Sequence, residues 1–166
     1  GSDLAVVVTA SQDVRRVAEE TARLDSSLLP RLGWVLCSKG IDRKSGKTLS
    51  DTWIDILGDD QADRTGVLSG PCIAPEVARG IPTSVAGAAG SPELAAAIQD
   101  AFMTPRFRVY TQGDVLGVEL GGSLKNVIAL AAGMCDGLGF GANTKASLIT
   151  RGLAEITRLA VRMGAE

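Results

Sequence analysis

Histidine is absent from the 166 residues, and cysteine occurs only at Cys37, Cys72 and Cys135. Zinc sites draw their ligands from closely spaced cysteines and histidines, so this composition excludes the common zinc motifs. Few and scattered cysteines are also typical of proteins from a reducing compartment. We therefore expect a cytoplasmic protein without a metal site.

An excess of charge of either sign is also missing. Lysine and arginine total 17 against 19 acidic residues, and the basic residues are scattered along the chain. A surface that binds nucleic acid or an anionic membrane needs clustered positive charge. The longest apolar stretch, Leu120 to Cys135, contains Lys125 and is shorter than the roughly 20 residues of a membrane-spanning helix. No signal peptide opens the chain, and we expect no nucleic-acid partner and no integral membrane contact.

Hydrophobic residues make up 45% of the chain, as in an ordinary globular protein. Over the first two thirds, short apolar runs alternate with segments of helical periodicity. This alternation predicts an α/β fold, namely part of a doubly wound, Rossmann-like parallel sheet with helices on both faces. The expected strands are residues 4–8, 34–37, 67–68, 83–86 and 107–110, and the expected helices are 14–24, 49–57, 75–78 and 91–102.

The pattern changes near Gly113, after which no strand-like segment follows. Apolar residues recur at helical spacing from Leu116 to Ala131 and again from Ile149 to Met163. We therefore divide the chain into an α/β domain over residues 1–112 and the start of an all-α domain over 113–166.

Lys125 is the most unusual residue of the second part, because it is the only charged residue between Glu119 and Asp136. Gly121 and Gly122 lie nearby, and two glycines inside a helix cost roughly 1 kcal/mol each relative to alanine. Glycines at such positions permit a close approach of another element or a ligand. A lysine on a packed helix that extends to solvent is the simpler interpretation. The functional one is a desolvated amine that accepts a proton.

Two segments follow expected strands, where ligands of open α/β sheets bind. Ser38-Lys39-Gly40 places a cation beyond the second strand. Residues 69–76 join a strand to a short helix, which indicates either an anion site or an ordinary turn. A third segment, Gly137 to Ala142, has the GxGxx(G/A) spelling of a dinucleotide site. It joins two helices rather than a strand and a helix, so we interpret it as a turn.

Taken together, these segments resemble the bacterial NAD(P)-dependent glycerol-3-phosphate dehydrogenases over essentially the whole chain. Many separate stretches match in family order, which makes the resemblance specific. They are Ser38 to Gly40, Leu68 to Pro71 with Ala74 and Glu76, Gly80 to Thr83, Phe107 to Tyr110, Asp114 to Glu119, Gly121 to Val127, Asp136 to Gly139, Asn143 to Ala146, and Leu148 to Glu155.

The resemblance implies an oxidoreductase that interconverts dihydroxyacetone phosphate and sn-glycerol 3-phosphate with NAD or NADP, in glycerophospholipid precursor synthesis. It implies a homodimer, with residues 1–112 as part of the dinucleotide-binding domain and 113–166 as the start of the substrate-binding domain. The implied catalytic base is Lys125. The implied substrate contacts are Lys39, Gly70, Cys72, Lys125 and Asn126, and the implied cofactor contacts are Lys39 and Ala74.

The sequence departs from the family in three respects. Cys72 replaces the usual serine or threonine, and a thiol is a weaker hydrogen-bond donor. Thr9 to Gln12 lacks the usual proline, which affects a nearby cofactor contact. The Gly-rich turn and the later phosphate-binding residues of the family have no counterpart here, so we expect an internal fragment with little or no turnover of its own.

Two other interpretations stay open at this stage. One is a related 3-hydroxyacid or sugar-acid dehydrogenase, which also combines a Rossmann domain, a helical domain and a lysine. The run from Gly121 to Val127 favours glycerol-3-phosphate dehydrogenase over it. The other is a non-catalytic helical dimerisation module on an α/β scaffold.

Overall fold

The computed structural model describes residues 3–24 and 31–166. Five strands alternate in it with four α-helices until the last strand ends, and two further helices then follow. The strands are β1 (Leu4–Val7), β2 (Gly33–Leu36), β3 (Thr65–Ser69), β4 (Thr83–Ala89) and β5 (Phe107–Gln112). The helices are α1 (Val14–Thr21), α2 (Leu49–Leu57), α3 (Ala74–Ala78), α4 (Pro92–Phe102), α5 (Val115–Gly137) and α6 (Ala142–Met163), with 3₁₀ turns η1 (Ser11–Asp13) and η3 (Asp59–Arg64).

Local sequence explains where several helices begin. The side chains of Thr48, Ser91 and Asp114 precede α2, α4 and α5, and each accepts a hydrogen bond from the backbone N–H three residues further on. Such N-caps satisfy N–H groups that have no partner within the helix. The predicted start of α4 at a serine followed by proline is therefore confirmed.

The five strands form one sheet in the order β1-β2-β3-β4-β5. The predicted parallel arrangement holds for β1 with β2, β2 with β3, and β4 with β5. It is wrong for β3 and β4, which are antiparallel, with Leu68 opposite Gly87. A parallel pair needs a crossover of a dozen or more residues, and the 13 residues between Ser69 and Thr83 are long enough for either arrangement. The sheet is thus mixed, within the predicted α/β class.

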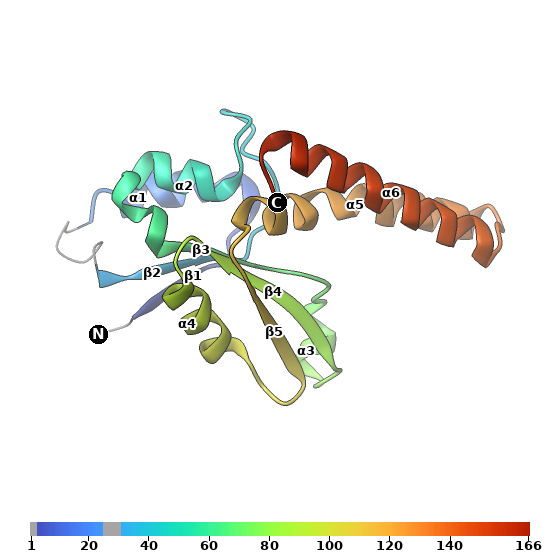
Figure 1. Cartoon of the computed structure of the whole chain (residues 1–166), viewed down its shortest axis with the longest axis horizontal. Coiled ribbons are helices and arrows are strands. Elements are labelled where there is room, and N and C mark those ends of the chain that lie inside the picture. The colour runs from blue at the N-terminus through green and yellow to red at the C-terminus, as the bar shows by residue number, and fades with distance from the viewer. Residues whose placement is uncertain (1–2, 25–30) are drawn as a thin grey trace.

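Side chains of alternate strand residues build a core on each face of the sheet. One core contains Trp34 and Leu36 of β2 with α1, α2 and the start of α5, and the Trp34 and Trp53 ring centroids lie 5.2 Å apart. The opposite core contains Val35 and Leu68 with α4. Figure 1 shows α1 and α2 on one side of the sheet and α4 on the other. Helices on both faces confirm this part of the prediction.

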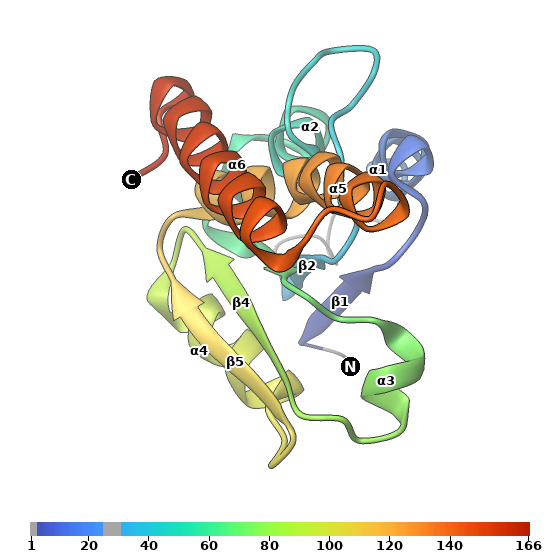
Figure 2. The same ribbon diagram turned by 90° about the vertical axis from the view of Figure 1, so that its right-hand side faces the viewer.

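Helices α5 and α6 form an antiparallel pair that projects away from the sheet (Figures 1 and 2). The start of α5 packs on β3 and β4, whereas its remaining length packs mainly on α6. Gly137 ends α5 and Gly139 adopts a φ of +73° before α6, so the predicted helix–helix turn is confirmed.

Helix α5 corrects one expectation about the membrane. With 23 residues it is long and apolar enough to cross a bilayer by length and composition, although the apolar stretch was expected to be too short. A single helix of this kind is weak support for a membrane span, because core helices meet the same criteria. Glu119 of α5 is buried against α2, and Ser123 and Lys125 hydrogen-bond to loops of the α/β part.

Candidate active site

The carboxyl ends of β2 and β3 bring together two loops that are far apart in the sequence. Lys39 lies three residues beyond β2, and Gly70 and Cys72 lie just beyond β3. Because β2 and β3 are parallel neighbours, both loops leave the same edge of the sheet. Ligands of α/β sheets bind beyond this edge.

The carbonyl oxygen of Gly70 is the centre of the site. It accepts a hydrogen bond from Lys125 Nζ at 3.1 Å and one from Cys72 Sγ at 3.5 Å. Lys39 Nζ in turn lies 3.8 Å from Cys72 Sγ. All four residues are half-buried. The structure thus joins two ammonium groups, a thiol and a carbonyl that the sequence separates by up to 86 positions.

Two predicted site residues lie outside this hydrogen-bonded group. Asn126 is exposed on α5, one residue beyond Lys125, and Ala74 is exposed at the start of α3. Successive helix residues point about 100° apart, so Lys125 and Asn126 face different directions. Within the described residues, no hydrogen bond joins either residue to Gly70 or Cys72, and their predicted ligand contacts stay predictions.

Ser123 attaches α5 to the loop that carries Lys39, a contact that sequence reasoning missed. Its hydroxyl accepts from Gly40 N–H at 2.9 Å and donates to the Gly40 carbonyl at 3.2 Å. Gly40 has a φ of +146°, a value that residues other than glycine rarely adopt. The serine within Gly-Gly-Ser-Leu-Lys-Asn was a signal, but nothing local indicated a partner 83 residues away.

Gly122 explains why α5 approaches β3 so closely. A Cβ atom at this position would overlap the Ser69 hydroxyl and would also lie 3.8 Å from Lys39 Cγ. The Ser69 Oγ is buried and has no hydrogen-bond partner among the described residues. No atom lies within 4 Å of the corresponding position on Gly121. Of the two glycines noted in the sequence, Gly122 therefore permits the close approach.

Glu119 is a buried carboxylate that fixes α5 to the first turn of α2. Its Oε1 accepts from the N–H groups of Leu49 and Ser50 at 2.7 and 3.1 Å, and its Oε2 accepts from Ser50 Oγ at 2.5 Å. The side chain is 4% exposed. Burial raises the pKa of Glu119, and the hydrogen bonds from Ser50 and Leu49 oppose that rise.

Cys37 lies on the face of the sheet opposite α1 and α2, near the loop of Cys72. Burial raises the pKa of Cys37 to about 11, the Lys39 ammonium lowers it, and the nearby Cys72 raises it. Cys37 is therefore a neutral thiol at physiological pH. Its surroundings give it a packing role on the core that contains Val35 and Leu68.

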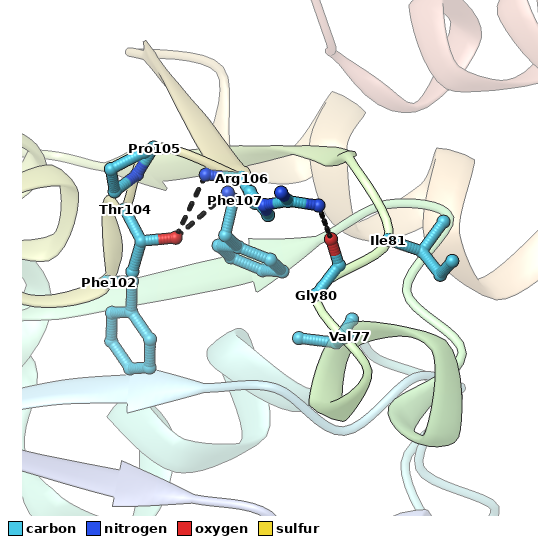
Figure 3. A pocket seen from close by; sticks show the side chains of 8 residues that line it. All are labelled: Val77, Gly80, Ile81, Phe102, Thr104, Pro105, Arg106 and Phe107. Atoms are coloured by element: carbon cyan, nitrogen blue, oxygen red, sulfur yellow. Dashed lines mark hydrogen bonds between the residues drawn. The ribbon is translucent and has the colours of Figure 1, made fainter.

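A separate apolar cavity of about 550 Å³ lies between α3, the end of α4 and the start of β5 (Figure 3). The aromatic rings of Phe102 and Phe107 line it, and Arg106 Nη1 donates to the Gly80 carbonyl at 3.1 Å. None of the predicted site residues lines this cavity. The cavity is a hydrophobic depression of the surface, and it is separate from the site formed by Lys39 and Lys125.

The mixed sheet, the helices on both of its faces and the helical pair that follows it define a Rossmann-like α/β protein, with Lys39 and Lys125 at the carboxyl edge of the sheet. Comparison with sequence families gives a closer assignment. Residues 1–95 match the model described as the N-terminus of NAD-dependent glycerol-3-phosphate dehydrogenase, and residues 114–166 match the C-terminus of the same enzyme. The chain belongs to the NAD-dependent glycerol-3-phosphate dehydrogenase family, a family of oxidoreductases.

Individual relatives agree with this assignment. Glycerol-3-phosphate dehydrogenase [NAD(P)+] of Geobacter sulfurreducens is 51% identical over all of this chain and 49% of its own length. The Moorella thermoacetica enzyme is 50% identical over 99% of this chain and 47% of its length. The chain thus spans about half the length of these relatives.

A crystal structure of glycerol-3-phosphate dehydrogenase from Coxiella burnetii superposes on the whole chain with a TM-score of 0.87 at 34% identity. The match covers 49% of that structure's chain. The enzyme from Saccharomyces cerevisiae superposes on 95% of this chain and 46% of its own, with a TM-score of 0.79 at 28% identity. The Rossmann-like class predicted from the sequence is therefore confirmed.

Proposed function

We propose that the polypeptide containing this chain interconverts dihydroxyacetone phosphate and sn-glycerol 3-phosphate by hydride transfer with NADH or NADPH, with Lys125 as the catalytic acid and base. The observation that carries this proposal is the Lys125 ammonium on the Gly70 carbonyl, beside Cys72 and Lys39. Ligands of Rossmann-like sheets bind beyond this edge, so the position of the two lysines supports a proton donor and a second cation at the proposed site.

The contact with Gly70 orients the Lys125 amine and leaves two of its N–H donors for a substrate. An ammonium group has three N–H donors, and the Gly70 carbonyl takes one of them. In ketone reduction, hydride adds to C2 of the substrate and a second N–H passes its proton to the C2 oxygen, which yields the alcohol and a neutral amine. In the reverse direction the neutral amine accepts the hydroxyl proton, and the hydride of C2 would pass to the oxidised NAD or NADP cofactor.

The remaining residues suit an anionic substrate and a dinucleotide cofactor. Lys39 offers a cation to a phosphate or to the developing negative charge on the C2 oxygen. Cys72 and Gly70 link the two lysines through hydrogen bonds, from Lys39 to Cys72 and from Cys72 and Lys125 to the Gly70 carbonyl. The chemistry of this group fits a nicotinamide cofactor, which when bound supplies or accepts the hydride, with Lys39 and Ala74 as its contacts in this chain. Asn126 is proposed to support the substrate beside Lys125.

Steady-state kinetics of the product of the complete reading frame tests the proposal. We expect oxidation of NADH or NADPH that depends on dihydroxyacetone phosphate, and a loss of roughly 10²- to 10⁴-fold in kcat for Lys125→Ala. Lys44, an exposed loop residue, provides the matched control Lys44→Ala with unchanged kcat. Circular dichroism confirms that each variant is folded. Full activity of Lys125→Ala would refute the role of this lysine.

Four broader features belong to the same proposal. The division into a dinucleotide-binding part at 1–112 and a substrate-binding part from 113 is supported by the end of β5 at Gln112. A homodimer is supported by exposed large apolar side chains on α5 and α6, such as Leu130 and Leu153. A cytoplasmic location and a place in glycerophospholipid precursor synthesis follow from the proposed reaction. A related 3-hydroxyacid or sugar-acid dehydrogenase is the competing activity, and a panel of substrates with the same enzyme separates these activities.

A further inference from the structure

Two side chains on one face of α5 hold the two ends of the loop that carries Lys39. Ser123 binds both backbone groups of Gly40, near the start of the β2–α2 loop. Glu119 binds the N–H groups of Leu49 and Ser50, where the loop enters α2. Glu119 and Ser123 are four residues apart, so they are neighbours on the same face of the helix.

The same helix carries Lys125, two residues beyond Ser123. Lys39 directly precedes Gly40, so the hydrogen bonds of Ser123 fix the backbone next to one lysine from the helix that holds the other. Lys125 reaches Gly70, and Lys39 reaches Cys72, two residues further on. The distance between the two amines is therefore set by α5 and its contacts with the loop.

We propose that Glu119 and Ser123 are positioning residues that keep the amines of Lys39 and Lys125 in the relative position that the reaction requires. We call this pair the α5 clamp. Ser123 acts through the backbone of the β2–α2 loop, and Glu119 acts through the first turn of α2, into which that loop leads. The catalytic consequence rests on the proposed function, whereas the effect on the geometry of Lys39 does not.

The contacts of the clamp residues support a role in positioning the β2–α2 loop rather than in non-specific packing of α5 against its neighbours. Glu119 is a buried carboxylate whose three hydrogen bonds all go to the first two residues of α2. Burying a charge is costly unless it is fully hydrogen-bonded, and apolar side chains would pack two helices without this cost. Its carboxylate instead specifies one position of α2 along α5. Gly122, between the two clamp residues, keeps the helix close to β3 and to the stem of Lys39.

Amine labelling of the 166-residue chain tests the geometry without reference to catalysis. The rate of acetylation of Lys39 by acetic anhydride is measured by peptide mass spectrometry, with the exposed Lys44 as internal reference. We expect Ser123→Ala and Glu119→Gln each to raise the Lys39 rate relative to Lys44 by roughly threefold or more. Ser147→Ala on α6 and Asp100→Asn on α4 replace exposed residues and should change nothing. Unchanged Lys39 labelling in both clamp variants would overturn the proposal.

A double-mutant cycle tests the catalytic consequence in the product of the complete reading frame. Ser123→Ala is expected to lower kcat by roughly 10- to 100-fold with the substrate KM changed less, and Ser123→Thr should restore most of the activity because it keeps the hydroxyl. In a Lys39→Ala background the further effect of Ser123→Ala should largely disappear. Equal losses in both backgrounds would refute positioning through Lys39. Absence of any dehydrogenase activity in the wild type would instead refute the proposed function, and the labelling result would still decide whether the clamp exists.

Discussion

At the scale of single residues, the thiols near the site differ in their surroundings. Cys72 contacts Lys39 and the Gly70 carbonyl, whereas Cys37 packs into the core on the α4 side of the sheet. Because only thiolates react with alkylating agents, the raised pKa of Cys37 makes its reactivity a direct measure of how tightly this part of the sheet is packed.

Alkylation of Cys37 should be slow at neutral pH and accelerate steeply with pH. With a pKa of about 11, its thiolate fraction at pH 8 is on the order of 100-fold below that of a free thiol. We expect the iodoacetamide rate at Cys37 to rise roughly tenfold per pH unit up to pH 10, read by peptide mass spectrometry. The urea-unfolded chain is the control. Equal rates in folded and unfolded chains at pH 8 would contradict this assignment.

The two adjacent glycines of α5 should respond oppositely to the same substitution. Gly122→Ala places a methyl group against the Ser69 hydroxyl, and such overpacking typically costs about 1–3 kcal/mol. Gly121→Ala meets no neighbouring atom and should stabilise the chain by about 0.5–1 kcal/mol through helix propensity. Urea denaturation measures both. Equal effects of the two substitutions would show that α5 does not approach β3 as described.

At the scale of elements, the β2–α2 loop has an internal brace as well as the clamp. Asp42 accepts from Arg15 of α1 at 2.7 Å and from both the N–H and the hydroxyl of Ser45 at 2.8 and 2.6 Å. The pKa of Asp42 lies well below its usual range, mainly because Arg15 donates a hydrogen bond to the carboxylate. The hydrogen bond from the Ser45 hydroxyl lowers this pKa further. The loop is thus fixed to α1 on one side and to α5 on the other.

Asp42→Asn should lower the urea midpoint at pH 7, and the difference from the wild type should shrink in acid. A carboxylate whose pKa is lower in the folded state stabilises the fold at every pH above its ordinary value of about 4. That contribution is lost as the pH falls through the folded-state pKa. Urea titrations between pH 7 and pH 2 follow the difference. A difference that does not depend on pH would mean that the charge of Asp42 is unimportant.

Elements were more predictable from the sequence than the contacts between them. The strand at Trp34, the cap at Ser91 and the loops of Lys39 and Gly70 followed from local patterns, because those patterns reflect burial and backbone chemistry within a few residues. The antiparallel pairing of β3 with β4 and the bonds of Ser123 with Gly40 depend on packing between distant segments. Glu119 is an acid among apolar residues of α5, yet nothing local identifies the first turn of α2 as its partner.

At the scale of the whole molecule, the projecting α5–α6 pair carries more exposed large apolar side chains than the five strands do. Large side chains on both helices are exposed, including Val127, Leu130 and Met134 on α5 and Leu153 on α6. The helices pack tightly on each other, with Ile128 against Gly152. Surfaces of this kind are typically buried in an assembly, in keeping with the proposed homodimer.

The 166-residue chain should therefore self-associate at micromolar concentration. We expect sedimentation to give a mass above the 17.1 kDa of one chain, and Leu130→Glu with Leu153→Glu to shift the population toward the monomer. Ser84→Glu, on the exposed side of β4, is a control that adds a negative charge away from the helical pair. A monomer at all concentrations would contradict the proposed dimer.

The place where α5 is attached also has a mechanical consequence. At 1.5 Å per residue, Gly137 lies about 27 Å along the helix from Glu119, whereas Lys125 lies only about 9 Å from it. If the helix tilts by about 5° with Glu119 as the pivot, its far end moves about 2.4 Å and the backbone of Lys125 about 0.8 Å. In this geometry a tilt of the projecting pair would displace its far end about three times as far as the backbone of Lys125, the proposed catalytic residue, because Lys125 lies close to the pivot.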